Sequence, residues 1–314
     1  MSQTFKGYLC GCLAAITYGT NPLGALFLYQ DGLRPTSVLF YRFAFGAVML
    51  GLLLLAQRKD MRLNRHEAIV LLGLGLLFSA SSITYYYSFM FMAAGLSATL
   101  LFLYPVMVAA IMALFFGERI TVSTVTAIVL SLAGIVLLYK GDGNSTLSLT
   151  GLLLVIISAL TYAVYIVMLN RSRVRMSSVK LTFYVLLLCV LSNVIASYFS
   201  PSGGLQGLHT LRSWLSAIGL GLFPTVLSLV LMAIAVQCVG STPTAVMGAL
   251  EPLTAVVIGV LVFHEQLTPR LTLGIVLILT AVGTIIMGKQ MARLHMFRYI
   301  GHFGHHRVKL WRWR

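Results

Sequence analysis

Long apolar runs separated by short polar breaks extend along the whole chain. Ten such runs can be distinguished, and each holds about 20 residues, enough to cross a hydrocarbon core about 30 Å thick as an α-helix. The breaks are tight turns such as Ala94-Gly95 or short charged segments such as Gly117-Glu118-Arg119. The pattern predicts an all-α polytopic membrane protein with ten transmembrane helices. The expected spans are 7–29, 36–56, 67–91, 95–116, 121–139, 149–169, 178–199, 212–236, 242–263 and 267–289.

Composition supports the same class. Of 314 residues, 59% are hydrophobic and 9% are charged, and so few charges cannot cover the surface of a soluble domain. The chain contains no His-Glu-x-x-His, Gly-x-Ser-x-Gly or P-loop motif, which argues against an enzyme. The four cysteines fall inside predicted spans or within two residues of a span end, and none has metal-ligand spacing with a histidine. We therefore expect no cofactor and no metal site.

The positive charge is distributed unevenly between the two sides of the membrane. With the N-terminus inside, 17 Lys and Arg residues lie on the cytoplasmic side and four lie outside. This bias predicts that both termini are cytoplasmic, in the inner membrane of a bacterium. The net charge of +15 thus reflects topology, and nucleic acid is not an expected partner. The tail, residues 290–314, is basic and aromatic, and we expect it to lie on anionic lipids.

The second half of the chain repeats the first. When residues 105–132 are aligned with 252–279, ten of the 28 pairs are identical. The most informative pairs are Pro105/Pro252, Glu118/Glu265 and Thr121/Thr268. Residues 1–143 and 144–289 are therefore predicted to be two copies of a five-helix unit. Because five is odd, the second copy enters the membrane inverted, an arrangement typical of alternating-access transporters.

Several short motifs follow one another in a defined order and spacing. They are Tyr18-Gly19-Thr20-Asn21-Pro22, Tyr41-Arg42-Phe43, Ala94-Gly95, Tyr104-Pro105 and Gly117-Glu118-Arg119 in the first half, and Gly240-x-x-x-x-Ala245, Leu250-Glu251-Pro252 and Phe263-His264-Glu265-Gln266-Leu267-Thr268 in the second. Their order and spacing resemble those of the EamA family, within the drug/metabolite transporter superfamily. The resemblance covers essentially the whole chain and implies ten helices around a central cavity that carries small organic metabolites, often outward. His264 stands where that family usually has a small residue.

Two charged residues lie deep inside predicted spans, away from the span ends. Glu251 is midway along the run from 242 to 263, and Arg42 is about two turns from the outer surface. Charges at such depth are costly and usually have a partner or a function. They could bind the charged groups of a zwitterionic substrate, or Glu251 could carry a proton. Alternatively, Glu251 braces the helix beside Pro252, and Arg42 snorkels to the headgroups or pairs with Glu251.

Three prolines lie inside spans: Pro22, Pro105 and Pro252. A proline removes a backbone donor and kinks a helix, and the carbonyl that it frees must be buried or face a cavity. We expect these kinked helices to line the pathway and to bend during transport. The alternative is that the kinks are static and serve packing.

Polar and aromatic residues on four spans could complete the site. Thr17 and Asn21 share a helix face because they are four residues apart, as do Thr161 and Tyr165. Tyr85-Tyr86-Tyr87 covers a wide arc, so at least one ring should face inward. Hydrogen bonding between helices and ordinary packing are the alternatives. The candidate pathway residues are Glu251, Arg42, Asn21, Thr17, Tyr18, Tyr104, Thr161, Tyr162, Tyr165 and Tyr86.

These features together predict a secondary transporter or exporter of small organic metabolites, working by alternating access as a monomer or homodimer. Amino acids or related compounds are the expected substrates. A nucleotide-sugar or sugar-phosphate carrier would need more intramembrane cations than Arg42. An intramembrane enzyme would need a polar catalytic cluster, and a scaffold would not explain the duplicated proline and acidic positions.

Overall fold

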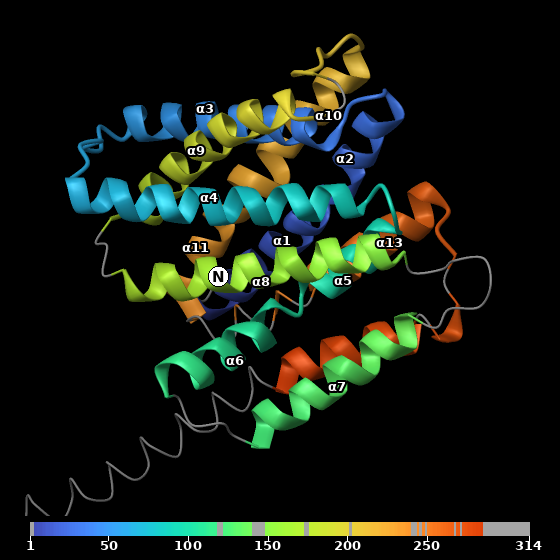
Figure 1. The fold of residues 1–314 in the computed structure, drawn as a ribbon. Helices are drawn as coiled ribbons and strands as arrows, with labels where there is room; N and C mark the ends of the chain where they lie inside the picture. Colours follow the sequence, from blue (N-terminus) through green and yellow to red (C-terminus); the bar gives the residue numbers. More distant parts are fainter. Residues whose placement is uncertain are drawn as a thin grey trace, which may run out of the picture.

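The structure is a computed structural model of the chain. It describes residues 3–117, 122–139, 148–172, 176–200, 203–239, 244, 247–248, 250–266, 268–270 and 272–284. These residues form helices and no strand (Figure 1). Within these described ranges, six helical segments are long and apolar enough to cross a membrane, namely Pro35–Ala56, Arg65–Ser88, Ala94–Phe116, Leu149–Leu169, Ser178–Tyr198 and Leu211–Val239. The chain is therefore all-α with several membrane-crossing helices.

Several of the expected spans are single, uninterrupted helices in the structure. Spans 36–56, 149–169 and 178–199 each correspond to one helix whose ends differ from the prediction by at most two residues. The described helices are α1 (Gln3–Gly19), α2 (Asn21–Gln30), α3 (Pro35–Ala56), α4 (Arg65–Ser88), α5 (Ala94–Leu101), α6 (Tyr104–Phe116), α7 (Val122–Tyr139), α8 (Leu149–Arg171), α9 (Ser178–Tyr198), α10 (Leu211–Gly221), η1 (Leu222–Leu227), α11 (Ser228–Val239) and α13 (Leu250–Phe263). A further apolar helix covers Thr272–Thr284.

Other expected spans are broken, and prolines lie at the breaks. The run 7–29 divides at Thr20 into α1 and α2, with Pro22 in the first turn of α2. The run 95–116 divides at Phe102-Leu103, with Pro105 in the first turn of α6. Pro252 lies in the first turn of α13. The first turn tolerates proline because its backbone N–H would have no partner within the helix.

The packing partners of the two halves correspond to each other. Helix α1 packs on α11, and α8 packs on α4. Helix α3 packs on α9, and α5 packs on α13. In the predicted repeats the first span matches the sixth, the second the seventh, the third the eighth and the fourth the ninth. A two-fold relation between the repeats would produce this set of contacts.

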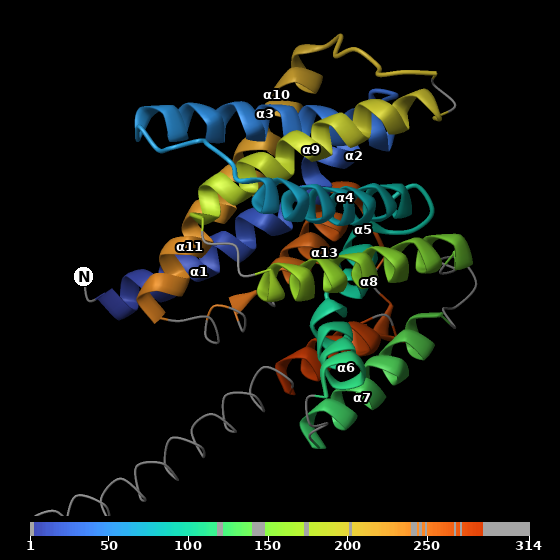
Figure 2. The same ribbon diagram turned by 60° about the vertical axis from the view of Figure 1, so that its left-hand side comes forward.

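The two ends of the bundle can be told apart by their loops. The amino-terminal end carries the start of α1 and residues 57–64, and Figure 2 shows the N-terminus there. The opposite end carries residues 31–34, 89–93, 203–210 and 264–266.

Hydrogen bonds join α3 and α9, or the loops next to them, at both ends. At the opposite end, Gln206 accepts from the Arg34 N–H at 2.6 Å and donates to the Gly32 carbonyl at 2.9 Å. At the amino-terminal end, Lys180 Nζ donates to the Arg62 carbonyl at 2.7 Å, and the Tyr184 hydroxyl donates to the Met61 carbonyl. This side of the molecule is therefore held by hydrogen bonds at both ends of the bundle.

Candidate functional site

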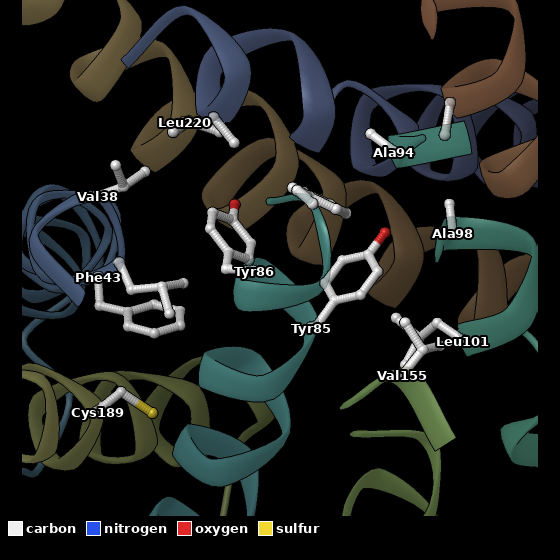
Figure 3. Close-up of a cluster of buried hydrophobic side chains, with 14 of the residues drawn as sticks. Val38, Phe43, Tyr85, Tyr86, Ala94, Ala98, Leu101, Val155, Cys189 and Leu220 are labelled. Carbon is white, nitrogen blue, oxygen red and sulfur yellow. The ribbon is translucent and has the colours of Figure 1, made fainter. Parts of the chain in front are cut away.

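Arg42 is the centre of a buried polar network. It lies on α3 and is 4% exposed. Its Nη1 donates to the Tyr86 hydroxyl of α4 at 2.9 Å, and its Nε donates to Thr225 Oγ1 of η1 at 3.1 Å. The Tyr86 hydroxyl donates in turn to Asn21 Oδ1 of α2 at 3.1 Å. Figure 3 shows Tyr86 among Phe43, Leu220 and Tyr85. The network thus joins four helical segments around one guanidinium group.

Two proline breaks hold members of this network in place. Pro22 leaves the Tyr18 carbonyl without its usual helical donor, and Asn21 Nδ2 donates to that carbonyl at 2.9 Å. Pro224 does the same to the Leu220 carbonyl, to which Thr225 Oγ1 donates at 3.0 Å. In each case the side chain next to the proline replaces the missing N–H. Its oxygen accepts a hydrogen bond from Tyr86 or Arg42.

Pro224 and Thr225 were not predicted from the sequence. The signal was present, because Pro224 interrupts the apolar run 212–236 and a hydroxyl side chain follows it. Here the chain forms the π-helix η1, in which one extra residue per turn relieves the clash of the proline ring. Thr225 then reaches Arg42 across 183 positions of sequence.

A cavity of about 100 Å³ adjoins the network. Its volume is that of a few water molecules or one small functional group. Arg42, Tyr18 and aromatic rings of α4 and α8 border it. It is lined by Tyr18, Arg42, Phe43, Phe78, Tyr162, Tyr165, Thr182, Val185, Leu186, Pro224, Thr225 and Leu229.

The aromatic side of the cavity has a defined geometry. The Tyr162 and Tyr165 rings are stacked, with centroids 5.7 Å apart and an interplanar angle of 8°. Tyr104 meets Tyr162 edge-on with centroids 4.8 Å apart. Phe78 contacts both α8 rings, with centroids 6.1 and 5.4 Å away. Such a surface can pack against a flat apolar group.

Glu251 lies beside this site on α13. The approach of α1 to α13 is very close, since a Cβ atom on Gly19 would be 2.6 Å from the Glu251 carbonyl oxygen. The Glu251 carboxylate is partly buried and interacts electrostatically with Tyr18, Tyr104 and Arg42. Within the described residues it forms no ion pair with Arg42, whose direct partners are hydroxyl groups. The direct pair with Arg42, one of the alternatives that the sequence left open, is therefore not formed in this structure.

Thr17 and Thr161 occupy matching positions on α1 and α8. Thr17 Oγ1 donates to the Leu13 carbonyl at 2.8 Å, and Thr161 Oγ1 donates to the Ile157 carbonyl at 2.8 Å. Both hydroxyls thus bond within their own helices. Neither residue lines the cavity. The basic tail, the 143/144 boundary and Glu118 lie outside the described residues.

Comparisons with known proteins agree with this architecture. The model of the EamA-like transporter family matches residues 5–140 and 149–287. An uncharacterized transporter of Archaeoglobus fulgidus is 31% identical over 270 aligned residues. The alignment covers 86% of this chain and 92% of the length of that transporter. The uncharacterized transporter YdfC of Bacillus subtilis is 26% identical over 283 aligned residues. The alignment covers 89% of this chain and 90% of the length of YdfC.

A solved crystal structure has the same fold, with a TM-score of 0.63 at 19% identity, covering 88% of this chain and 95% of the solved one. The match to the family model spans both halves and nearly the whole length of the chain. The chain belongs to the EamA family of the drug/metabolite transporter superfamily and is an integral multi-pass membrane protein.

Proposed function

We propose that this protein is a secondary transporter that moves small organic metabolites, most simply amino acids or related compounds, by alternating access. In this proposal ten spans form two inverted five-helix repeats with both termini in the cytoplasm. The observation that carries the proposal is the buried Arg42 guanidinium beside an aromatic cavity, where helices of both halves meet.

The charge balance at Arg42 indicates what would bind. Its partners Tyr86 and Thr225 are neutral, so they orient the guanidinium without cancelling its charge. A buried cation without a counter-ion is costly, and a substrate carboxylate would lower that cost through charge-assisted hydrogen bonds. Glu251, near but not paired with Arg42, could then face an ammonium group or carry a proton.

The same arrangement disfavours the nucleotide-sugar or sugar-phosphate alternative. A doubly charged phosphate is usually bound by several cationic side chains. Within the described residues, Arg42 is the one basic side chain that lines the cavity, and it is buried. One guanidinium and an aromatic surface suit a singly charged, partly apolar molecule.

Alternating access would rely on a difference between the two sides of the bundle. The α3–α9 side is secured at both ends, whereas proline-broken segments such as α1–α2 and α5–α6 border the site. Breaks of this kind concentrate bending at a few residues. The proposed motion therefore rocks the broken helices against the α3–α9 side.

Uptake of labelled metabolites into proteoliposomes tests this function, with amino acids measured first and with and without a pH gradient. We expect flux in the wild type, loss of flux for Arg42→Met, and loss of gradient acceleration for Glu251→Gln. Glu67→Gln is the matched control, because Glu67 lies in the exposed capping box of α4. Equal flux in the wild type and Glu251→Gln would remove Glu251 from the mechanism, and unchanged flux in Arg42→Met would remove the proposed binding site.

A further inference from the structure

Helix α5 begins without a cap of its own. The residue before it is Ala93, whose side chain cannot accept a hydrogen bond. The first backbone N–H groups of any helix lack partners within that helix and carry partial positive charge. In this structure the Ala94 N–H donates to Glu265 Oε1 at 2.9 Å, and the Gly95 N–H also interacts with that carboxylate. One half of the chain therefore caps a helix of the other half.

The end of α13 holds the Glu265 carboxylate in position. Helix α13 stops at Phe263, and His264 adopts a left-handed conformation with φ of 55°. The Glu265 N–H then donates to the Gly259 carbonyl at 3.0 Å, six residues back, so the chain folds back onto the end of α13 after the left-handed residue. The left-handed turn explains why a small residue suits position 264, and Gly117 has φ of 65° at the matching position of the first repeat.

Two glycines make room for this contact. A Cβ atom on Gly259 would be 2.1 Å from Glu265 Oε2, so the carboxylate rests directly on the helix backbone. A Cβ atom on Gly95 would be 2.8 Å from the Val256 Cα, which brings α5 and α13 almost into backbone contact. Burial raises the pKa of the Glu265 carboxyl, and the N–H groups of Ala94 and Gly95 oppose that rise.

The contact differs from those on the α3–α9 side. There, hydrogen bonds join the two halves at each end of the bundle. On the α5–α13 side, within the described residues, the halves are joined at the opposite end by the Glu265 carboxylate over closely packed backbone. A single carboxylate on a helix end can be released without breaking a ladder of hydrogen bonds.

We propose that Glu265 is the latch that closes the transport pathway at the opposite end of the bundle. While Glu265 caps α5, the start of α5 and the end of α13 stay together and the site is closed from that side. Opening requires the carboxylate to leave Ala94. This inference rests on the proposed alternating access, and a static cap that only stabilises α5 is the competing explanation.

The latch is tested by measuring, from each side of the membrane, how fast a single cysteine is labelled. The reporter is Ala98→Cys in a variant without the native cysteines, because Ala98 lies one turn behind the capped end and is 3% exposed. A membrane-impermeant maleimide is applied to intact cells and to inverted vesicles. We expect Glu265→Gln to increase the labelling rate from the side of the α5 start by about five- to thirtyfold, the range open to loss of a partly buried charge at a helix N-terminus.

Two further variants control the experiment. Gly259→Ala leaves Glu265 intact but displaces its carboxylate, and it should increase labelling in the same way. Glu67→Gln removes a carboxylate that caps α4 locally at the amino-terminal end, and it should leave labelling unchanged. Unchanged labelling in folded Glu265→Gln and Gly259→Ala, or a loss of thermal stability without faster labelling, would overturn the latch.

The readout separates this inference from the transport proposal. Labelling does not require a substrate. Faster labelling without flux of any tested metabolite would leave the latch in place and count against the substrate class. Flux without a labelling change would overturn the latch alone.

Discussion

Tyr86→Phe gives a direct measure of the network around Arg42. The substitution keeps the ring, which is fully buried among Phe43 and its neighbours, and removes only the hydroxyl. That hydroxyl accepts from Arg42 Nη1 at 2.9 Å and donates to Asn21 Oδ1 at 3.1 Å. The packing is preserved, so the change in unfolding free energy reports these two hydrogen bonds.

The expected magnitude follows from the two partners. A hydrogen bond to a charged group contributes about 1.5–3 kcal/mol. A hydrogen bond between helices in a membrane contributes about 0.6 kcal/mol on average. Tyr86→Phe should therefore lower the free energy of unfolding by about 2–3.5 kcal/mol. Combined with Arg42→Met in a double-mutant cycle, it should show a coupling energy of about 1 kcal/mol or more.

Unfolding by sodium dodecyl sulfate in mixed micelles, followed by circular dichroism, measures both quantities. Tyr85→Phe is the matched control, since Tyr85 is the adjacent residue, is 6% exposed, and its hydroxyl makes no hydrogen bond within the described residues. Its cost should stay below about 0.5 kcal/mol. The reasoning fails if Tyr85→Phe costs as much as Tyr86→Phe, or if the coupling energy with Arg42 is zero.

Two other substitutions test neighbouring contacts. Gly19→Ala places a Cβ atom 2.6 Å from backbone of α13 and should destabilise the protein by about 1–3 kcal/mol, whereas Gly283→Ala, which meets nothing within 4 Å, should change stability little in the same unfolding assay. Thr225→Val keeps its shape but loses the acceptor for Arg42 and the donor to the freed carbonyl. It should lower stability by about 2 kcal/mol and reduce metabolite flux, and unchanged values would exclude this role of the hydroxyl.

The apolar pattern was enough to locate many helices but not their interruptions. Spans 36–56 and 178–199 are continuous helices, because nothing inside them opposes helical hydrogen bonding. The break at Thr20 could be anticipated from Pro22. The π-helix around Pro224 could not, since the same proline could have produced a simple kink, and the choice depends on packing against α3.

The candidate site was only partly visible in the sequence. Arg42 stood out because a charge inside an apolar run is rare. Phe78 did not, because apolar side chains face both lipid and protein interior in a membrane, so hydrophobic periodicity does not separate cavity from surface. Thr17 is the opposite case. It is polar and was expected to face the pathway, but its hydroxyl donates to a carbonyl of its own helix.

The sequence by itself determined the membrane class, the duplicated segments and the family, because run length, charge placement and motif order are properties of the linear chain. The tertiary structure decided which groups meet. Arg42 bonds to Thr225 across 183 positions, and Glu265 caps Ala94 across 171. Such pairings depend on how helices of the two halves approach one another, and a short sequence pattern does not show which distant residues come into contact.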